Sequence, residues 1–374
     1  MSLKPKNPEH PKRIVFLTNL ATPYKTDQIE SWARLIPGLE IVVWYLEESV
    51  GDNLWAKPSA TVRPWREEAL KGIRAWLRFY FSIRNSVLLV GGYYLIPYWV
   101  ARLMAFCSGV PVSLVFDGIN PQKVSSTLVG IRGYLKKRFI HSCDSFFANG
   151  VVGKQFFEAL KEEAPLFNQG LFADVGQKKN LAPDPQNRQR ESLGIAPDSI
   201  VVVFCGRLIS RKCVDDLIHA MSYFDSSSNV RLLVIGDGLE RGNLESLSKE
   251  LKVPVCFAGA YTDRGKLFSL ISECQILVLP SSDDPWGMVV NEALQLGLRV
   301  IVSDRCGCSL DLLSHPDAAK VFPVHDRKCL HSAIKLFVET QIGFEKVAIA
   351  AGAINDPKRS ALELQRLLSQ GIQK

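Results

Sequence analysis

Residues 276–296 read ILVLPSSDDPWGMVVNEALQL, and this stretch decides the fold class of the chain. Its apolar beginning predicts a buried strand over 275–279, and the Pro-Ser-Ser that follows predicts the exit loop of that strand. Its end predicts a helix over 291–296. A buried strand that leads through a loop into a helix is the unit from which parallel α/β sheets are built.

The same alternation of strands and helices runs along the chain in two series. In the first, we expect strands at 13–19, 40–45, 87–90, 112–116 and 145–148, and helices at 24–35, 67–84, 96–106, 130–143 and 150–160. In the second, we expect strands at 200–205, 231–235, 255–257, 275–279 and 299–302, and helices at 214–221, 239–251, 263–272, 291–296 and 326–338. Each series predicts a doubly wound sheet with helices on both faces.

A polar segment at 178–198 with three prolines separates the two series and predicts an inter-domain linker. At 374 residues the chain exceeds the size of a single core, which also favours two domains. We therefore expect an α/β protein with two Rossmann-like doubly wound domains facing across a cleft. The predicted domains are 1–180 and 181–356, and a last helix at about 357–374 is expected to pack back on the first domain.

Composition favours a protein of a reducing compartment. The nine cysteines are odd in number and mostly lie in apolar runs, which argues against a disulfide framework. Cys306-Gly307-Cys308 could be redox-active, but a structural role is the favoured interpretation. Residues 1–12 lack the apolar stretch of a secretory signal and predict a loose tail. We expect a cytoplasmic location.

The uncharged segment 86–101 could be mistaken for a membrane span. It has sixteen residues, short of the roughly 20 that a spanning helix needs. Gly91-Gly92 and Pro97 also interrupt it. The segment therefore predicts a strand, a turn and the start of a buried helix.

Four motifs of the second series stand at the ends of predicted strands. They are Phe204-Cys205-Gly206-Arg207-Leu208 with Lys212, then Val234-Ile235-Gly236-Asp237-Gly238, then Phe257-Ala258-Gly259, and the acidic stretch from Asp284 to Glu292. Fixed cations, tight glycine turns and a helix start with free N–H groups suit a ligand that carries both phosphates and hydroxyls, as a sugar nucleotide does.

In this order the motifs resemble those of the retaining GT-B glycosyltransferases of family 4, the glycosyl transferases group 1. The resemblance implies that Arg207 and Lys212 hold the donor diphosphate and that Glu292 binds the ribose hydroxyls. Asp284 and the backbone of the next loop would position the sugar. The remaining donor-site residues that it implies are Gly206, Gly287, Met288, Val289, Gly259, Ala260 and Tyr261, the last three beside the nucleobase.

The chain departs from the family pattern at several positions. Cys213 stands where glycine is usual after the lysine, and Asp284 where the first acid is normally glutamate. Asp283 is a neighbouring candidate for that acid, but the spacing favours Asp284. The alternative interpretation makes Arg207 and Lys212 surface charges, Asp284 a helix cap and Glu292 a solvated helix residue.

The first domain matches the family less closely. In place of a glycine-rich first loop it has Asn19 followed by Pro-Tyr-Lys, so Tyr24 and Lys25 are candidates to bind the acceptor or a phosphate. The alternative is a capped helix start. None of the six histidines occupies the family's usual active-site position; Asp117, at a strand end, takes that place. Asp117 is a candidate catalytic residue or, alternatively, a turn residue with Gly118.

The activity that this resemblance implies is hexosyl transfer (EC 2.4) from a UDP or GDP sugar to a glycan or lipid-linked acceptor. We expect no cofactor and no metal, because no Asp-X-Asp motif follows a strand. The alternatives are a sugar-nucleotide epimerase and a non-catalytic scaffold that binds a sugar nucleotide or a glycan.

The positive charge of the chain lies in its first half. Residues 1–180 hold 23 Lys and Arg against 15 Asp and Glu, and the remainder holds 22 against 23. The predicted helix 67–84 has Lys71, Arg74 and Arg78 on one face, and on the other Ile73, Trp76, Leu77 and Tyr80. Either the apolar face packs on the sheet, or the helix contacts an anionic membrane. Nucleic acid is not expected as a partner, because the basic residues lack interleaved aromatics.

Overall fold

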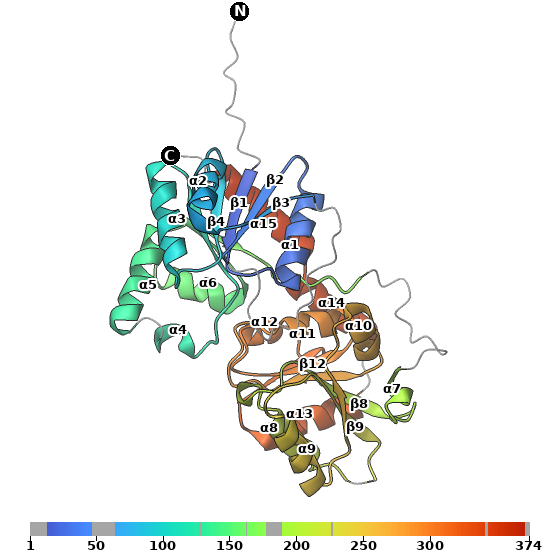
Figure 1. Ribbon diagram of the computed structural model, residues 1–374. Helices are drawn as coiled ribbons and strands as arrows, with labels where there is room; N and C mark the ends of the chain where they lie inside the picture. Colours follow the sequence, from blue (N-terminus) through green and yellow to red (C-terminus); the bar gives the residue numbers. More distant parts are fainter. Residues whose placement is uncertain are drawn as a thin grey trace, which may run out of the picture. The chain divides into compact units, whose positions relative to one another are not determined.

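The structure is a computed structural model, and it describes residues 13–46, 64–126, 129–161, 163–176, 189–225, 227–340 and 343–370 (Figure 1). The predicted N-terminal tail and most of the predicted linker lie outside these residues. The chain divides into two compact units. The N-terminal unit comprises Met1–Asp117, Val124–Phe172 and Pro357–Lys374, and the C-terminal unit comprises Gly118–Lys123 and Ala173–Asp356.

The N-terminal unit is built on a parallel sheet of seven strands in the order β3-β2-β1-β4-β5-β6-β7. Its central strands are runs of apolar and β-branched residues that are buried on both faces, as helices on both sides require. The strands are β1 (Arg13–Thr18), β2 (Glu40–Tyr45), β3 (Arg66–Ala69), β4 (Val87–Val90), β5 (Val112–Phe116), β6 (Ser145–Ala148) and β7 (Leu166–Asn168).

Helices cover this sheet, and one of them comes from the C-terminal end of the chain (Figure 1). The C-terminal helix buries Leu364, Leu367 and Leu368 in the same core as Trp32 and Ile29. The helices are α1 (Pro23–Leu35), α2 (Gly72–Ser82), α3 (Ile96–Cys107), α5 (Gly130–Ser142), α6 (Gly150–Glu158) and α15 (Pro357–Gln370), with the short α4 (Lys123–Ser126) where the two units meet in the chain.

The helix predicted at 67–84 begins too early. Residues 66–69 form β3, which pairs with β2 at the edge of the sheet, and α2 starts only at Gly72. Glu67 accepts hydrogen bonds from Trp65 Nε1 at 2.9 Å and Tyr45 Oη at 3.3 Å. The polar Arg-Glu-Glu-Ala sequence gives no strand signal, and its pairing with β2 decides its conformation.

The uncharged segment 86–101, which has the composition of a membrane span, contains β4 and the start of α3. Helix α3 begins at Ile96, the predicted start. Within the part of the chain that the structure describes, no helix combines the length and apolarity needed to cross a bilayer. The prediction that α3 is a buried helix holds for one side only, because Leu103 and Phe106 are 61% and 72% exposed.

The C-terminal unit has a parallel sheet of six strands in the order β10-β9-β8-β11-β12-β13. Its strands are β8 (Ile200–Cys205), β9 (Val230–Ile235), β10 (Val255–Gly259), β11 (Ile276–Leu279), β12 (Arg299–Ser303) and β13 (Ala319–Phe322). Its helical elements are α7 (Gln189–Ser192), η2 (Ser210–Lys212), α8 (Val214–Met221), α9 (Arg241–Glu250), α10 (Arg264–Ser272), α11 (Met288–Gln295), α12 (Ser309–Leu312), α13 (Arg327–Glu339) and α14 (Phe344–Ile354).

Candidate functional site

The predicted donor residues of the C-terminal unit stand at the carboxyl edge of its sheet. The strand order reverses between β8 and β11, and in open parallel sheets ligands bind outside the strand ends at such a point. The loops after β8 and β9 approach each other very closely there. A Cβ atom on Gly236 would lie 1.9 Å from the carbonyl oxygen of Gly206, so this contact requires glycine at position 236.

The loop after β8 carries two cationic side chains that differ in exposure and pairing. Arg207 is exposed, and its guanidinium makes no hydrogen bond or ion pair with the residues that the structure describes. Lys212, at the end of η2, is largely buried, and its Nζ lies 2.5 Å from Oδ2 of Asp284. One charge is therefore available to a ligand, and the other is fixed by a carboxylate.

Backbone pairing holds Asp284 in place. Its N–H donates to the carbonyl of Arg305 at 3.3 Å, and its carbonyl accepts from the N–H of Gly307 at 2.9 Å. Ser282 N–H donates to the carbonyl of Arg211 at 2.8 Å, which ties the same loop to η2. Gly287, not Asp284, is the cap residue of α11, so the interpretation of Asp284 as a helix cap is wrong.

Helix α11 begins at Met288, three residues before the predicted start. Gly287 precedes it with φ of 96°, and a Cβ atom there would lie 2.7 Å from Cδ2 of Leu279, so the turn requires glycine. The N–H groups of Met288 and Val289 lie in the first turn, where a helix has no acceptor of its own for them. The helix start can therefore bind an anion or a sugar oxygen.

Glu292 and Lys212 both act on the thiol at the end of β8. The pKa of Cys205 is raised to about 12, mainly by burial and also by the charge of Glu292, while the charge of Lys212 acts in the opposite direction. Both charged groups therefore lie within electrostatic reach of Cys205. The structure thus brings Lys212, Asp284 and Glu292 together around the ends of β8 and β11, as a ligand with phosphates and hydroxyls would require.

The loop predicted beside the nucleobase follows β10. Gly259 ends this strand with φ of 74°, and its carbonyl accepts from Gly236 N–H at 2.8 Å. Ala260 is exposed, and Tyr261 is half-buried. These residues lie at the same carboxyl edge of the sheet as the charged groups.

Asp283 has partners of its own. Lys123 Nζ lies 2.6 Å from its Oδ2, and Asn120 Nδ2 donates to its Oδ1 at 3.3 Å. Burial opposes ionisation, but these hydrogen bonds and the charges of Lys123 and Arg211 outweigh it, and the pKa of Asp283 is lowered. Asp283 is thus paired with Lys123, and Asp284 is paired with Lys212.

The Cys306-Gly307-Cys308 motif supports the packing of this loop. Burial raises the pKa of Cys306 to about 12 and that of Cys308 well above its usual value, so both thiols are protonated. A Cβ atom on Gly307 would lie 1.8 Å from the carbonyl oxygen of Pro285. These contacts support the structural interpretation of the motif.

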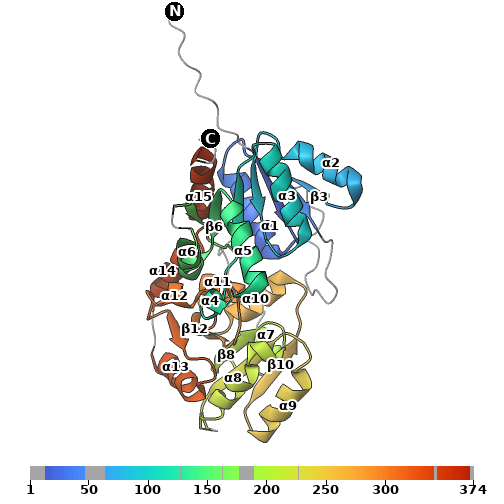
Figure 2. The same cartoon turned by 90° about the vertical axis from the view of Figure 1, so that its left-hand side faces the viewer.

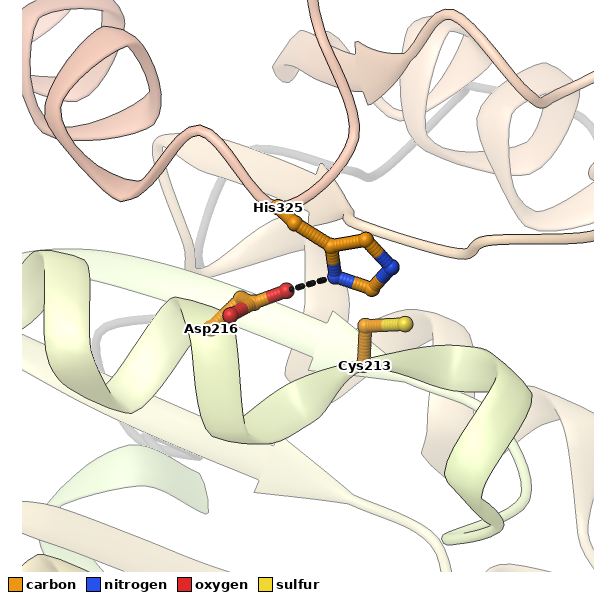
Figure 3. Close-up of side chains that lie close together, drawn as sticks. All are labelled: Cys213, Asp216 and His325. Carbon is orange, nitrogen blue, oxygen red and sulfur yellow. Dashed lines mark hydrogen bonds and ion pairs between the residues drawn. The ribbon is translucent and has the colours of Figure 1, made fainter.

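Cys213, next to Lys212 in the chain, forms a second cluster with Asp216 and His325 (Figure 3). Their ligand atoms lie within 4.8 Å of one another, close enough to be considered for a metal ion. Asp216 is buried, and both its oxygens are engaged, Oδ2 with His325 Nδ1 at 2.7 Å and Oδ1 with Arg327 Nε at 2.6 Å. The cluster is thus an ion-pair network that joins α8 to the loop before α13.

The N-terminal unit brings its three predicted residues to one pocket. Tyr24, Lys25 and Asp117 line a cavity of about 260 Å³ at the carboxyl ends of β1, β4 and β5. Lys25 is buried, and its Nζ lies 2.9 Å from Thr18 Oγ1 and 3.4 Å from Asp117 Oδ2. Tyr24 Oη donates to the same carboxylate oxygen at 3.2 Å. Burial, and then the charge of Asp117, raise the pKa of Tyr24 well above its usual value.

The two simpler interpretations of these residues fail. Thr22 precedes α1 without making a side-chain capping bond, so this is not a capped helix start. Asp117 is bound by side chains of other elements, unlike a turn residue. Gln169 donates through Nε2 to Asp117 Oδ1 at 3.3 Å and to Gln28 Oε1 at 3.1 Å. The sequence motifs do not single out Gln169, because the strand β7 that precedes it is not among the predicted strands.

Solved structures with two parallel-sheet α/β units resemble this chain along its length. Anabaena HepE in complex with UDP is 17% identical, with a TM-score of 0.72 over 96% of this chain and 100% of that chain. This fold is GT-B.

Residues 185–352 match the model of the family glycosyl transferases group 1. An uncharacterized glycosyltransferase of Methanocaldococcus jannaschii is 32% identical over 138 residues, which are 36% of this chain and 35% of that protein. A GDP-mannose-dependent alpha-(1-6)-phosphatidylinositol dimannoside mannosyltransferase of Mycobacterium tuberculosis is 31% identical over 108 residues, 29% of this chain and 28% of that protein. The chain thus spans about a third of the length of the curated relatives it matches.

Proposed function

We propose that this protein is a retaining, metal-independent glycosyltransferase that moves a hexose from a UDP or GDP sugar to a glycan or lipid-linked acceptor. One observation carries the proposal. An unpaired Arg207, the Lys212–Asp284 pair and the start of α11 share one sheet edge, inside the region that matches the family.

The charges of the site suit the departure of a nucleoside diphosphate. Arg207 and Lys212 stabilise the negative charge that grows on the diphosphate as the bond to the sugar breaks. Glu292 binds the ribose hydroxyls, and the loop of Asp284 with the N–H groups of 287–289 positions the sugar. Because Asp284 holds Lys212 at 2.5 Å, its first task in this proposal is to orient that cation.

The acceptor hydroxyl is assigned to the N-terminal pocket. Asp117 presents a carboxylate that is one-third exposed, beside a buried Lys25 and the Tyr24 hydroxyl. Such a group can accept a hydrogen bond from a sugar hydroxyl or stabilise positive charge at the anomeric carbon. The name of the mycobacterial relative includes a phosphatidylinositol glycan, which favours a lipid-linked acceptor at the inner face of the membrane.

Calorimetry with UDP and GDP tests the donor site. We expect one of the two to bind, and Arg207→Ala and Glu292→Ala to weaken it, while Lys335→Ala on the exposed side of α13 leaves it unchanged. If neither nucleotide binds, the donor assignment is wrong. Nucleotide binding without sugar transfer to any of a panel of glycans and glycolipids would favour the scaffold alternative.

Two further measurements address the mechanism. Proton NMR of the first product reports the anomeric configuration, and a retained configuration is expected. Transfer should also persist in EDTA, since we assign no role to a metal; loss of transfer that Mg²⁺ or Mn²⁺ restores would refute metal independence.

A further inference from the structure

Three helices of the N-terminal unit turn apolar side chains toward solvent. We call the exposed outer sides of α2, α3 and α5 the three-helix face. Its exposed apolar residues range from 36% for Trp99 to 81% for Ile131. They are Ile73, Leu77 and Phe81 on α2, Ile96, Trp99, Leu103 and Phe106 on α3, and Ile131, Tyr134 and Leu135 on α5.

Helix α2 is apolar on two opposite sides. Ile73, Leu77 and Phe81 are spaced four residues apart, so they fall on one side of the helix. Ala75 and Phe79 are shifted by two residues, which places them on the other side, and they are the buried residues of α2. The alternative in which Ile73 and Leu77 pack on the sheet is therefore wrong, because the buried residues of α2 lie on the Ala75 side.

Helix α3 repeats this arrangement. Its exposed apolar residues follow spacings of three, four and three residues from Ile96 to Phe106, which keeps them on one side. The small Ala101 and Ala105 face the core. The side of α3 that faces water thus lacks the polar residues that a surface helix normally has.

The three helices form one continuous surface. Helices α2 and α3 pack together, and the rings of Trp99 on α3 and Phe139 on α5 lie 5.0 Å apart. Arg102 Nε on α3 donates to the carbonyl of Ser142 on α5 at 2.7 Å. Figures 1 and 2 both show α2, α3 and α5 next to one another on one side of the N-terminal unit.

The three helices carry charge of one sign, and Glu68 of β3 pairs with Arg78 at their edge at 3.2 Å. None of the three helices contains an aspartate or a glutamate. From residue 69 to residue 143 the chain has a single acidic residue, Asp117, which lines the pocket, against ten Lys and Arg. The basic residues on the face or at its rim are Arg74, Arg78, Arg102, Arg132, Lys137 and Arg138.

We propose that the three-helix face docks on the surface of an anionic lipid bilayer. Apolar side chains would enter the boundary of the acyl chains, and the arginines and lysines would contact the lipid phosphates. Trp99 and Tyr134 suit this depth, since their rings have an apolar body and a polar edge. A second copy of the face fits poorly, because two such surfaces would bring like charges together. The inference rests on the proposed function, because an enzyme with a lipid-linked acceptor works at a membrane surface.

Vesicle flotation with the full chain tests the proposal. We expect the protein to float with vesicles of phosphatidylcholine and phosphatidylglycerol in equal parts, and much less with phosphatidylcholine alone. Added salt should weaken the binding, since it screens the lysine and arginine contacts. Equal binding to both vesicles, or no binding at low salt, overturns the proposal.

Two variants separate the apolar from the charged contribution. The triple variant Ile73→Ser, Leu77→Ser, Phe81→Ser should bind the anionic vesicles at least about tenfold more weakly. Arg74→Gln with Arg78→Gln should bind at least about fivefold more weakly, the loss expected for one charge, because Glu68 already pairs with Arg78. The matched controls are Leu239→Ser and Lys335→Gln, an exposed leucine and an exposed lysine of the C-terminal unit.

The outcomes distinguish this inference from the proposed function. UDP and GDP binding by the same variants should match the wild type, since the changes lie outside the donor residues. Wild-type flotation by the α2 variants, or a dimer in light scattering that the triple variant dissolves, refutes membrane docking and leaves the donor assignment standing. Flotation without nucleotide binding refutes the donor assignment instead.

Discussion

Each unit of the protein carries a lysine–aspartate pair at the carboxyl edge of its parallel sheet. In the C-terminal unit Lys212 and Asp284 lie 2.5 Å apart, and each side chain is 11% exposed. In the N-terminal unit Lys25 and Asp117 lie 3.4 Å apart, with side chains 5% and 31% exposed. In the first pair both side chains are largely buried against each other. In the second pair the carboxylate of Asp117 is accessible from a pocket.

The groups around each pair explain the difference. In the C-terminal unit, unpaired Arg207 stands five residues before Lys212, so the surroundings offer positive charge. In the N-terminal unit the hydroxyl of Tyr24 and the amide of Gln169 donate hydrogen bonds to Asp117. These bonds fix the orientation of its carboxylate. The same residue pair thus suits a diphosphate in one unit and a hydroxyl in the other.

The largest effect is expected from Lys212→Ala. It removes a cation from the proposed diphosphate site and leaves the buried carboxylate of Asp284 without its partner. We expect sugar transfer to fall at least about a hundredfold, because preorganised charge at a leaving group contributes that much. Turnover of the donor sugar, followed by release of nucleoside diphosphate, measures it. Near-normal turnover would show that the Lys212–Asp284 pair has only a structural role.

Arg207→Ala should weaken the nucleotide without affecting the fold. A hydrogen bond to a charged group contributes about 1.5–3 kcal/mol, so UDP or GDP should bind about tenfold to a hundredfold more weakly by calorimetry. The melting temperature should stay unchanged, since the guanidinium pairs with no described residue. Unchanged nucleotide affinity would show that the unpaired Arg207 does not bind the nucleotide.

Asp117→Ala should affect stability and leave the donor site intact. It takes the carboxylate partner from the buried Lys25, which still has Thr18, so we expect a loss of about 1–3 kcal/mol in urea unfolding. Nucleotide affinity should match the wild type. Asp117→Asn serves as the matched variant because it keeps an oxygen for Tyr24 and Lys25. A drop in nucleotide affinity would show that the two pairs serve one ligand.

The smallest effect is expected from a third pair, Lys123–Asp283, whose side chains are 51% and 33% exposed. The pKa of Asp283 is lowered in the folded protein, so its stabilisation is present above the unfolded pKa of about 3.9 and is lost as the pH falls through the folded pKa. Lys123→Met should cost less than about 1 kcal/mol at pH 7. The cost should vanish in acid melts, and an equal cost at both pH values would contradict this.

The strand framework could be predicted from the sequence because central parallel strands are apolar throughout. The strands at 87–90, 112–116 and 200–205 have the predicted bounds. The short edge strand β3 was missed, because pairing with β2 and not its polar sequence determines it. The start of α11 was predicted late, since only packing against Leu279 reveals Gly287 as the turn.

The candidate site divides in the same way. Charged residues just after strands could be located from sequence, because parallel strands bring their carboxyl ends to one edge. Their pairings could not, because Lys212 with Asp284 and Gln169 with Asp117 depend on side-chain packing between distant segments. Apolar spacing likewise predicted the amphipathic helix α2, but it does not show which side of a helix packs against the core.

The C-terminal helix α15 sets an order of events during synthesis. Leu364 and Leu367 complete a core that otherwise consists of residues before 173, and Ser360 accepts a hydrogen bond from Trp32 Nε1 at 2.9 Å. Elongation at about 5–20 residues per second leaves roughly 10 to 40 seconds between residue 172 and this helix. During that interval the apolar surface that α15 later covers, which includes Ile29 and Trp32, stays exposed on the nascent N-terminal unit.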